Sequence, residues 1–145
     1  MYKRILLAYD GTVAGQKALL DCRETAKLQG AERYLIAVMP QDSVFVAGEA
    51  AYYDPRVVEE EKKAFERILA EGLERLSDPD RPAKGEVIVG QPVDAIVQYA
   101  KRIEADLIVV GHKHLDNWAK RWWSGSVSKS LIEHSHCSVL VVITP

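Results

Sequence analysis

Four consecutive residues near the end of the chain, Gly125-Ser126-Val127-Ser128, begin a stretch of helical periodicity. The first turn of a helix carries backbone N–H groups without partners inside the helix, and the helix dipole makes that end positive. The two serine hydroxyls add further hydrogen-bond donors. The segment therefore predicts an anion site, most simply for a phosphate, at the start of a helix. The alternative interpretation is an ordinary helix start, capped by Ser124 or Ser126, with nothing bound.

Two further candidates stand directly after apolar runs. Asp10 follows RILLAY, and Gly111 follows ADLIVV. If these runs are neighbouring strands where the strand order of an open α/β sheet reverses, both residues emerge at the crevice in which such sheets bind ligands. Asp10 has a second interpretation as the cap of the helix that follows it, and Thr12 has the same capability.

Short apolar runs alternate with segments of helical periodicity along the chain, and these elements must position the candidates. The runs contain few polar residues, which predicts strands covered on both faces, at residues 4–8, 34–39, 86–89, 106–110 and 138–143. Apolar residues at helical spacing occupy the intervals between them. Gly30 predicts a left-handed end to the first helix, and Pro55 and Pro92 suit first-turn positions.

The resulting order is β-α-β-α-β-α-β-α-β. Such alternation calls for a mostly parallel sheet with helices on both faces and right-handed crossovers, which is a three-layer α/β sandwich. A length of 145 residues and a hydrophobic content of 48% suit one domain spanning residues 1–145.

Composition excludes several classes of partner. The formal net charge is −2, so no long-range basic field exists to hold a nucleic acid or an anionic membrane. No segment has the length of a signal peptide or a membrane-spanning helix, and we expect a cytoplasmic protein. Cys22 and Cys137 form no CxxC pair, which favours free, buried thiols over a disulfide or a zinc site.

Neither a metal site nor a catalytic site is predicted. The four histidines, His112, His114, His134 and His136, form two i, i+2 pairs, but no carboxylate or cysteine accompanies the first pair at metal-ligand spacing. The chain has no GxxxxGK[ST] loop, no GxSxG elbow and no paired-carboxylate motif. We therefore do not predict an enzyme, and slow ATP hydrolysis stays open as a weaker hypothesis.

Two long connections invite a functional interpretation. The linkage from Pro40 to Asp54 carries apolar and aromatic residues, so it is either a lid over the crevice or a surface loop that packs its own aromatics. All three tryptophans lie within residues 118–123, where the periodicity predicts a short amphipathic helix. This helix either packs on the body of the protein or presents an aromatic platform to a protein partner.

Three segments of the chain together carry a resemblance to a known family: KRILLAYDGT at its start, ADLIVVGHKH before the tryptophans and GSVSKSLIEHSHCSVLVV near its end. Through them the chain resembles the universal stress protein family along essentially its whole length. In nucleotide-binding members of that family, one loop wraps the phosphates of ATP. Its pattern is a glycine, two residues, a second glycine, nine residues and then Gly-Ser or Gly-Thr. Gly111 matches the first position and Gly125-Ser126 the last. His114 stands at the second, and the spacer from Leu115 to Ser124 has ten residues.

The resemblance implies an adenine nucleotide alpha hydrolase-like fold with strand order 3-2-1-4-5, and ATP as ligand, with or without Mg²⁺ or Mn²⁺. It places Ala8 and Asp10 beside the adenine and ribose, and Val38 against the base. It places Gly111 and His114 near the phosphates. The residues that would supply N–H and hydroxyl donors are Gly125, Ser126, Val127 and Ser128.

The resemblance also implies a homodimer in which the last strand, Ser138 to Ile143, pairs with its copy. An apolar edge strand left open invites aggregation, so covering it by dimerisation is physically reasonable. We expect a homodimeric, ATP-binding regulatory module of the stress response, in which ATP orders residues 112–124 and changes the surface that an unidentified protein partner meets. The alternative is a dimeric interaction protein of the same family that binds no nucleotide, and His114 with its longer spacer is the feature that distinguishes the two.

Overall fold

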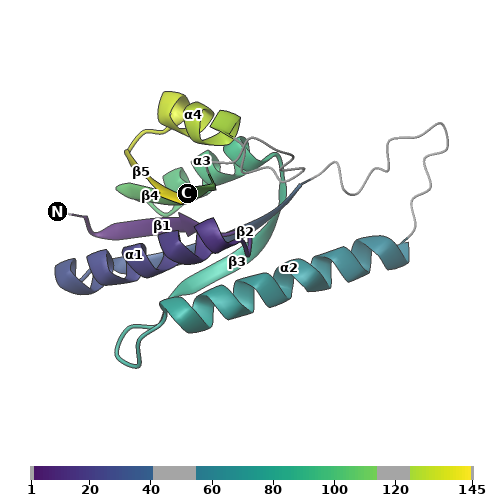
Figure 1. The fold of residues 1–145 in the computed structure, drawn as a ribbon, viewed down its shortest axis with the longest axis horizontal. Coiled ribbons are helices and arrows are strands. Elements are labelled where there is room, and N and C mark those ends of the chain that lie inside the picture. The colour runs from purple at the N-terminus through teal and green to yellow at the C-terminus, as the bar shows by residue number, and fades with distance from the viewer. Residues whose placement is uncertain (1, 41–54, 114–124, 145) are drawn as a thin grey trace.

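The computed structural model describes residues 2–40, 55–113 and 125–144, in which strands and helices alternate as the sequence predicts (Figure 1). The elements are β1 (Arg4–Ala8), α1 (Val13–Gln29), β2 (Glu32–Pro40), α2 (Pro55–Leu76), β3 (Lys84–Gly90), α3 (Pro92–Arg102), β4 (Leu107–Lys113), α4 (Gly125–His134) and β5 (Ser138–Thr144). The main difference from the sequence prediction is β4, which continues past Val110 to Lys113.

The five strands form one parallel sheet in the order β3-β2-β1-β4-β5. This confirms the predicted strand order and its reversal between β1 and β4. In the register, Ala8 of β1 lies between Ile36 of β2 and Val110 of β4. The carboxyl ends of β1 and β4 therefore lie side by side at one edge of the sheet.

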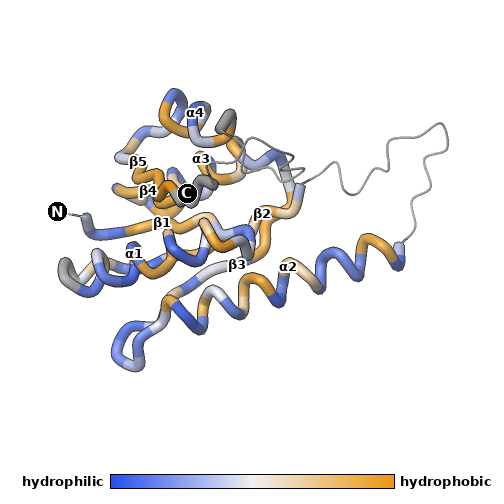
Figure 2. The backbone as a smooth tube through the Cα atoms, viewed as in Figure 1, coloured by the Kyte–Doolittle hydropathy of each residue, from blue (hydrophilic) through white to orange (hydrophobic). Residues whose placement is uncertain are grey.

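Helices cover both faces of the sheet, with α1 and α2 on one side and α3 and α4 on the other (Figure 1). Successive residues of β1 enter opposite layers, because strand side chains alternate: Leu6 and Ala8 pack towards α3 and α4, and Ile5, Leu7 and Tyr9 towards α1 and α2. Two-sided burial explains why the central strands are apolar throughout, as Figure 2 shows, whereas α2 alternates between apolar and polar residues.

The helix ends follow the chemistry of the residues that stand there. Gly30 ends α1 with a left-handed φ of 69° and donates its N–H to the Ala26 carbonyl, as predicted. Pro55 and Pro92 are the first residues of α2 and α3. The Gln91 side chain accepts a hydrogen bond from the Asp94 N–H and so caps α3, which the sequence analysis did not anticipate.

The cysteines agree with their predicted role as free thiols. Cys22 is buried among the residues beneath α1, and Cys137 is half-buried. Burial raises the pKa of the Cys22 thiol to about 12, so this side chain stays protonated and packs as a small apolar group.

An ionic network fixes the turn between α2 and β3 onto the rest of the molecule. The side chain of Arg33, at the start of β2, is 2% exposed and its Nη1 lies 3.1 Å from Asp78 Oδ2. Its Nη2 donates to the Arg81 carbonyl at 2.6 Å. Arg23 of α1 donates to the other carboxylate oxygen of Asp78 at 2.9 Å. Asp78 therefore joins this turn to α1 and β2, which lie 55 and 45 residues earlier in the sequence at the contacting arginines.

We predict that Asp78→Asn destabilises the fold in a pH-dependent manner. Hydrogen bonds, first from Arg33, lower the pKa of the Asp78 carboxyl in the folded state. A lowered folded-state pKa contributes stability above the unfolded value, about 3.9, and that contribution disappears as the pH falls through the folded value. The free energy of unfolding in urea should therefore drop in the variant at pH 7, and the difference from the wild type should shrink at pH 3.

Asp80→Asn is the matched control, because Asp80 is an exposed acid of the same turn and makes no ion pair among the described residues. An Asp78→Asn difference of the same size at both pH values would contradict the role assigned to the carboxylate charge.

Candidate functional site

The candidate site lies at the carboxyl edge of the sheet, where the strand order reverses. Ala8 pairs with Val110, so Asp10 and Gly111 emerge at this edge from adjacent strands. The helices α1 and α4 connect the ends of parallel strands to the starts of others, and their amino-terminal ends therefore also face it. This is the general position of ligand sites in open α/β sheets.

Asp10 is held in a fixed orientation by Thr12. Asp10 is only 8% exposed. Its Oδ1 accepts hydrogen bonds from the Thr12 N–H at 2.9 Å and from the Thr12 hydroxyl at 2.5 Å. The cap of α1 is Thr12 itself, whose Oγ accepts from the Gly15 N–H at 3.1 Å. Of the two capping interpretations, the one with Thr12 is confirmed, and Asp10 is left to act as an oriented carboxylate.

Gly111 is required by packing between β4 and α1. A Cβ atom at this position would overlap the Ala14 carbonyl and stand 2.8 Å from the Gly15 nitrogen. Both neighbours are backbone atoms of the first turn of α1, so no side-chain movement relieves the contact. The absence of a side chain thus lets α1 approach the end of β4, a role that the sequence analysis missed because it depends on a contact between distant segments.

The predicted anion site falls at the start of α4, and the binding of an anion there stays a prediction. The helix begins at Gly125, as the sequence predicts. Val127 is 8% exposed and packs with Leu131 in the layer beneath α3 and α4, so its side chain anchors the helix. Ser128 is also 8% exposed, and its Oγ forms no hydrogen bond with the described residues. The Ser128 hydroxyl therefore has a hydrogen-bonding capacity that the other described residues do not use.

Two other predicted contacts, Ala8 and Val38, lie in the core of the molecule. Ala8 is 1% exposed and Val38 is 0% exposed, and both belong to the apolar layer that α3 and α4 cover. Their contact with an adenine base stays a prediction.

Several predicted features lie outside the described residues. These are His114, the tryptophan segment with its predicted short helix, and the predicted lid that follows Pro40. Over residues 2–40, 55–113 and 125–144, no group of three or more His, Cys, Asp or Glu side chains is arranged to hold a metal ion. Within the same ranges, no helix combines the length and apolar composition needed to cross a bilayer.

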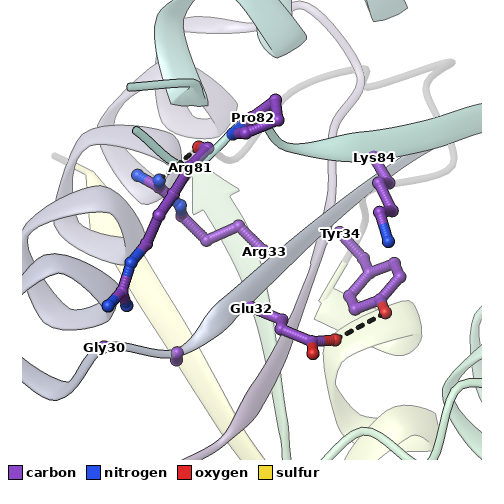
Figure 3. A pocket seen from close by; sticks show the side chains of 8 residues that line it. Gly30, Glu32, Arg33, Tyr34, Arg81, Pro82 and Lys84 are labelled. Carbon is purple, nitrogen blue, oxygen red and sulfur yellow. Dashed lines mark hydrogen bonds between the residues drawn. The ribbon is translucent and has the colours of Figure 1, made fainter. Parts of the chain in front are cut away.

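A separate hollow of about 300 Å³ opens at the opposite edge of the sheet, at the amino ends of β2 and β3 (Figure 3). Its lining residues are Gly30, Ala31, Glu32, Arg33, Tyr34, Arg81, Pro82 and Lys84. It contains none of the residues that the sequence analysis assigned to ligand binding. Its position makes it a second feature of the molecule, distinct from the carboxyl edge.

A parallel, doubly wound sheet with an oriented carboxylate and a helix start at its switch point defines a class of ligand-binding α/β protein. The sequence profile described as the universal stress protein family matches residues 1–142. The chain belongs to this family. Among its relatives, a universal stress protein from Methanocaldococcus jannaschii is 30% identical over 145 residues, which cover 100% of this chain and 84% of the relative.

Solved structures share the fold. A universal stress protein family structure from Burkholderia pseudomallei has a TM-score of 0.75 at 23% identity, with 97% and 96% of the two chains covered. The Archaeoglobus fulgidus protein in complex with dAMP has a TM-score of 0.61 at 21% identity, covering 97% and 98%. An Arabidopsis thaliana family protein with AMP bound has a TM-score of 0.62 at 16% identity, covering 99% and 92%.

We predict that Gly111→Ala destabilises the fold by about 1–3 kcal/mol, because the added methyl group meets fixed backbone. Urea unfolding at pH 7 measures the change. Gly90→Ala, at the end of the edge strand β3, is the matched control, because the nearest atom to its Cβ is the Ala95 methyl at 3.9 Å. Equal losses in the two variants would show that the close approach of α1 to β4 has no special energetic weight.

Proposed function

We propose that this protein is a cytoplasmic, homodimeric regulatory module, formed by one domain over residues 1–145, that binds an adenine nucleotide at the carboxyl edge of its sheet. ATP is the ligand that we assign, and a protein partner reads the nucleotide-bound surface. Family membership supports the class of function, and the AMP and dAMP complexes of structural neighbours support adenine nucleotides as the class of ligand.

The observation that carries the proposal is the environment of Ser128. Its hydroxyl is buried, forms no hydrogen bond with the described residues and lies in the first turns of α4. A phosphate oxygen supplies the missing acceptor and gains the amide N–H groups at the start of the same helix. Hydrogen bonds to a charged group are worth about 1.5–3 kcal/mol each, so a few of them offset the cost of ordering the ligand.

Asp10 supplies the complementary acceptor. The two hydrogen bonds from Thr12 fix one carboxylate oxygen, so the orientation of the whole carboxylate is set before any ligand arrives. In dinucleotide-binding α/β folds a carboxylate accepts hydrogen bonds from ribose hydroxyls, and we assign Asp10 the same role here. Donors at α4 and an acceptor at β1 thus match the two ends of a nucleoside phosphate.

A divalent ion, if present, enters with the nucleotide. The described residues hold no cluster of three or more metal-ligating side chains, so the phosphate oxygens themselves would provide most of the ligands of Mg²⁺ or Mn²⁺. We assign the site to binding, and slow ATP hydrolysis stays open as the weaker hypothesis.

The dimer contact that we assign is β5. β5 is an outermost strand of the sheet, with a neighbouring strand on one side only. Leu140 and Ile143 on this strand are 39% and 58% exposed. An unpaired apolar edge is a template for strand pairing, and pairing with a second copy satisfies its backbone groups without leaving an open end.

We predict that purified wild-type protein, extracted with acid, releases adenine nucleotide, and that Ser128→Ala weakens ATP binding roughly tenfold, because it removes a donor to a charged oxygen. Asp10→Asn and Ser126→Ala should also weaken binding several-fold. Isothermal titration calorimetry at constant salt measures each affinity.

Ser130→Ala is the matched control, since Ser130 lies on the same helix two positions beyond the predicted donors and in a half-buried environment. Absence of binding by the wild type at millimolar ATP would overturn the proposal and favour the interaction protein that uses no nucleotide.

We further predict that Leu140→Glu combined with Ile143→Glu converts the protein to a monomer, because two charges would have to be buried against a second copy. Analytical ultracentrifugation measures the mass. Val89→Glu is the control on the opposite edge strand, where Val89 is 52% exposed. A wild-type monomer, or a dimer that survives the double change, would contradict the assignment of β5.

A further inference from the structure

The hollow at the amino ends of β2 and β3 has the size and chemistry of a small ligand site. Its volume of about 300 Å³ is at the lower limit of pockets that hold organic ligands, about 300–1,000 Å³. Its lining combines the aromatic ring of Tyr34, the ring of Pro82 and the methyl group of Ala31 with charged groups from two strands and a turn (Figure 3).

The charges of the hollow are unequal. Three cations line it, Arg33, Arg81 and Lys84, against the one carboxylate of Glu32. Arg33 is neutralised by Asp78. Within the described part of the chain, neither Arg81 nor Lys84 forms an ion pair. Arg81 thus has no carboxylate in contact among the described residues, and Lys84 acts on Glu32 only at longer range, where its charge helps to lower the pKa of that carboxyl.

The acids of this region are already engaged. Glu32 accepts a hydrogen bond from the Tyr34 hydroxyl at 2.8 Å and lies 3.5 Å from Arg4 Nε. That hydrogen bond lowers the pKa of the Glu32 carboxyl, which therefore stays charged and bound to its own partners. Asp78 is shared between Arg23 and Arg33. Both carboxylates therefore already hold other cations at contact distance, and Lys84 acts on Glu32 without forming an ion pair with it.

The backbone of Arg81 is held in place by three hydrogen bonds. Its N–H donates to the Asp78 carbonyl at 3.0 Å, and its carbonyl accepts from the Asp78 N–H at 3.2 Å and from Arg33 Nη2 at 2.6 Å. Figure 3 shows its guanidinium beside Gly30 and the Lys84 ammonium beside the Tyr34 ring, on opposite sides of the hollow in that view. Gly30 permits this position, since a Cβ there would stand 2.9 Å from Arg81 Nη1.

We propose that this hollow binds a small dicarboxylate, with one carboxylate on the Arg81 guanidinium, the other on the Lys84 ammonium, and the short apolar chain between them on Tyr34 and Pro82. A guanidinium matches a carboxylate with two parallel hydrogen bonds, and an ammonium serves as a compact second charge. Two separated cations with an apolar wall between them select an anion with two charged ends over one with a single charged centre.

The experiment is a nuclear magnetic resonance titration of the ¹⁵N-labelled full chain with malonate, succinate, glutarate and, separately, inorganic phosphate, at constant pH and low ionic strength. We expect saturable shifts of the amides of Ala31, Arg33, Arg81 and Lys84, with a Kd on the order of 1 mM for the dicarboxylate of best length. Arg81→Gln and Lys84→Ala should each weaken this binding roughly tenfold, the effect of one charge-assisted contact.

The matched controls are Arg67→Gln and Lys62→Ala, which remove exposed cations of α2 outside the hollow and should leave the dicarboxylate affinity unchanged. Binding of ATP by Arg81→Gln should equal that of the wild type, so the outcome is independent of the function proposed for the carboxyl edge. The proposal is overturned by the absence of saturable shifts, or by equal weakening in the control variants. It is also overturned if phosphate saturates the site as tightly as every dicarboxylate, or if the Arg81 and Lys84 variants lose stability but bind normally.

Discussion

The pairing of β1 with β4 is the constraint on which the rest of the molecule depends. It reverses the strand order in the middle of the sheet, so that helices leave β1 and β4 towards opposite faces, and this is the position at which open α/β sheets bind ligands. The pairing also requires α1 to pass close to the end of β4, and only a residue without a side chain at Gly111 permits that approach. One backbone contact thus sets both the packing of α1 and the position of the candidate site.

The two edges of the sheet differ in charge for a physical reason. At the carboxyl edge, the amino-terminal ends of α1 and α4 carry unpaired N–H groups and the positive ends of their dipoles, so backbone alone favours an anion there. At the amino edge, helices present carbonyl groups, and anion binding requires cationic side chains instead. Arg33, Arg81 and Lys84 supply them, and Asp78 fixes the turn that carries Arg81.

The sequence predicted features that depend on local pattern and failed on those that depend on distant contacts. The continuous apolar runs predicted every strand of the sheet, because burial on both faces leaves no polar alternation. Gly30, Pro55 and Gly125 marked helix ends correctly, because the backbone at those positions restricts which residues fit. The strand order came from the family resemblance, since periodicity alone does not tell which strands are neighbours.

The packing role of Gly111 could not be predicted, because it depends on Ala14 and Gly15 from a segment about a hundred residues away in the chain. The division of labour between Asp10 and Thr12 was also open, since both residue types cap helices and only geometry shows that Thr12 does so. The amino-edge hollow was missed altogether. Its residues come from two segments that are distant in the sequence, 30–34 and 81–84, and in each segment the charged side chains resemble ordinary surface residues.

The most direct test of the central claim is a crystal structure of the protein grown with ATP. The account predicts phosphate oxygens within hydrogen-bond distance of the Ser128 hydroxyl and of the amide groups that begin α4, and the ribose at the Asp10 carboxylate. A nucleotide found at another surface, with Ser128 bonded instead to the protein's own atoms, would contradict it.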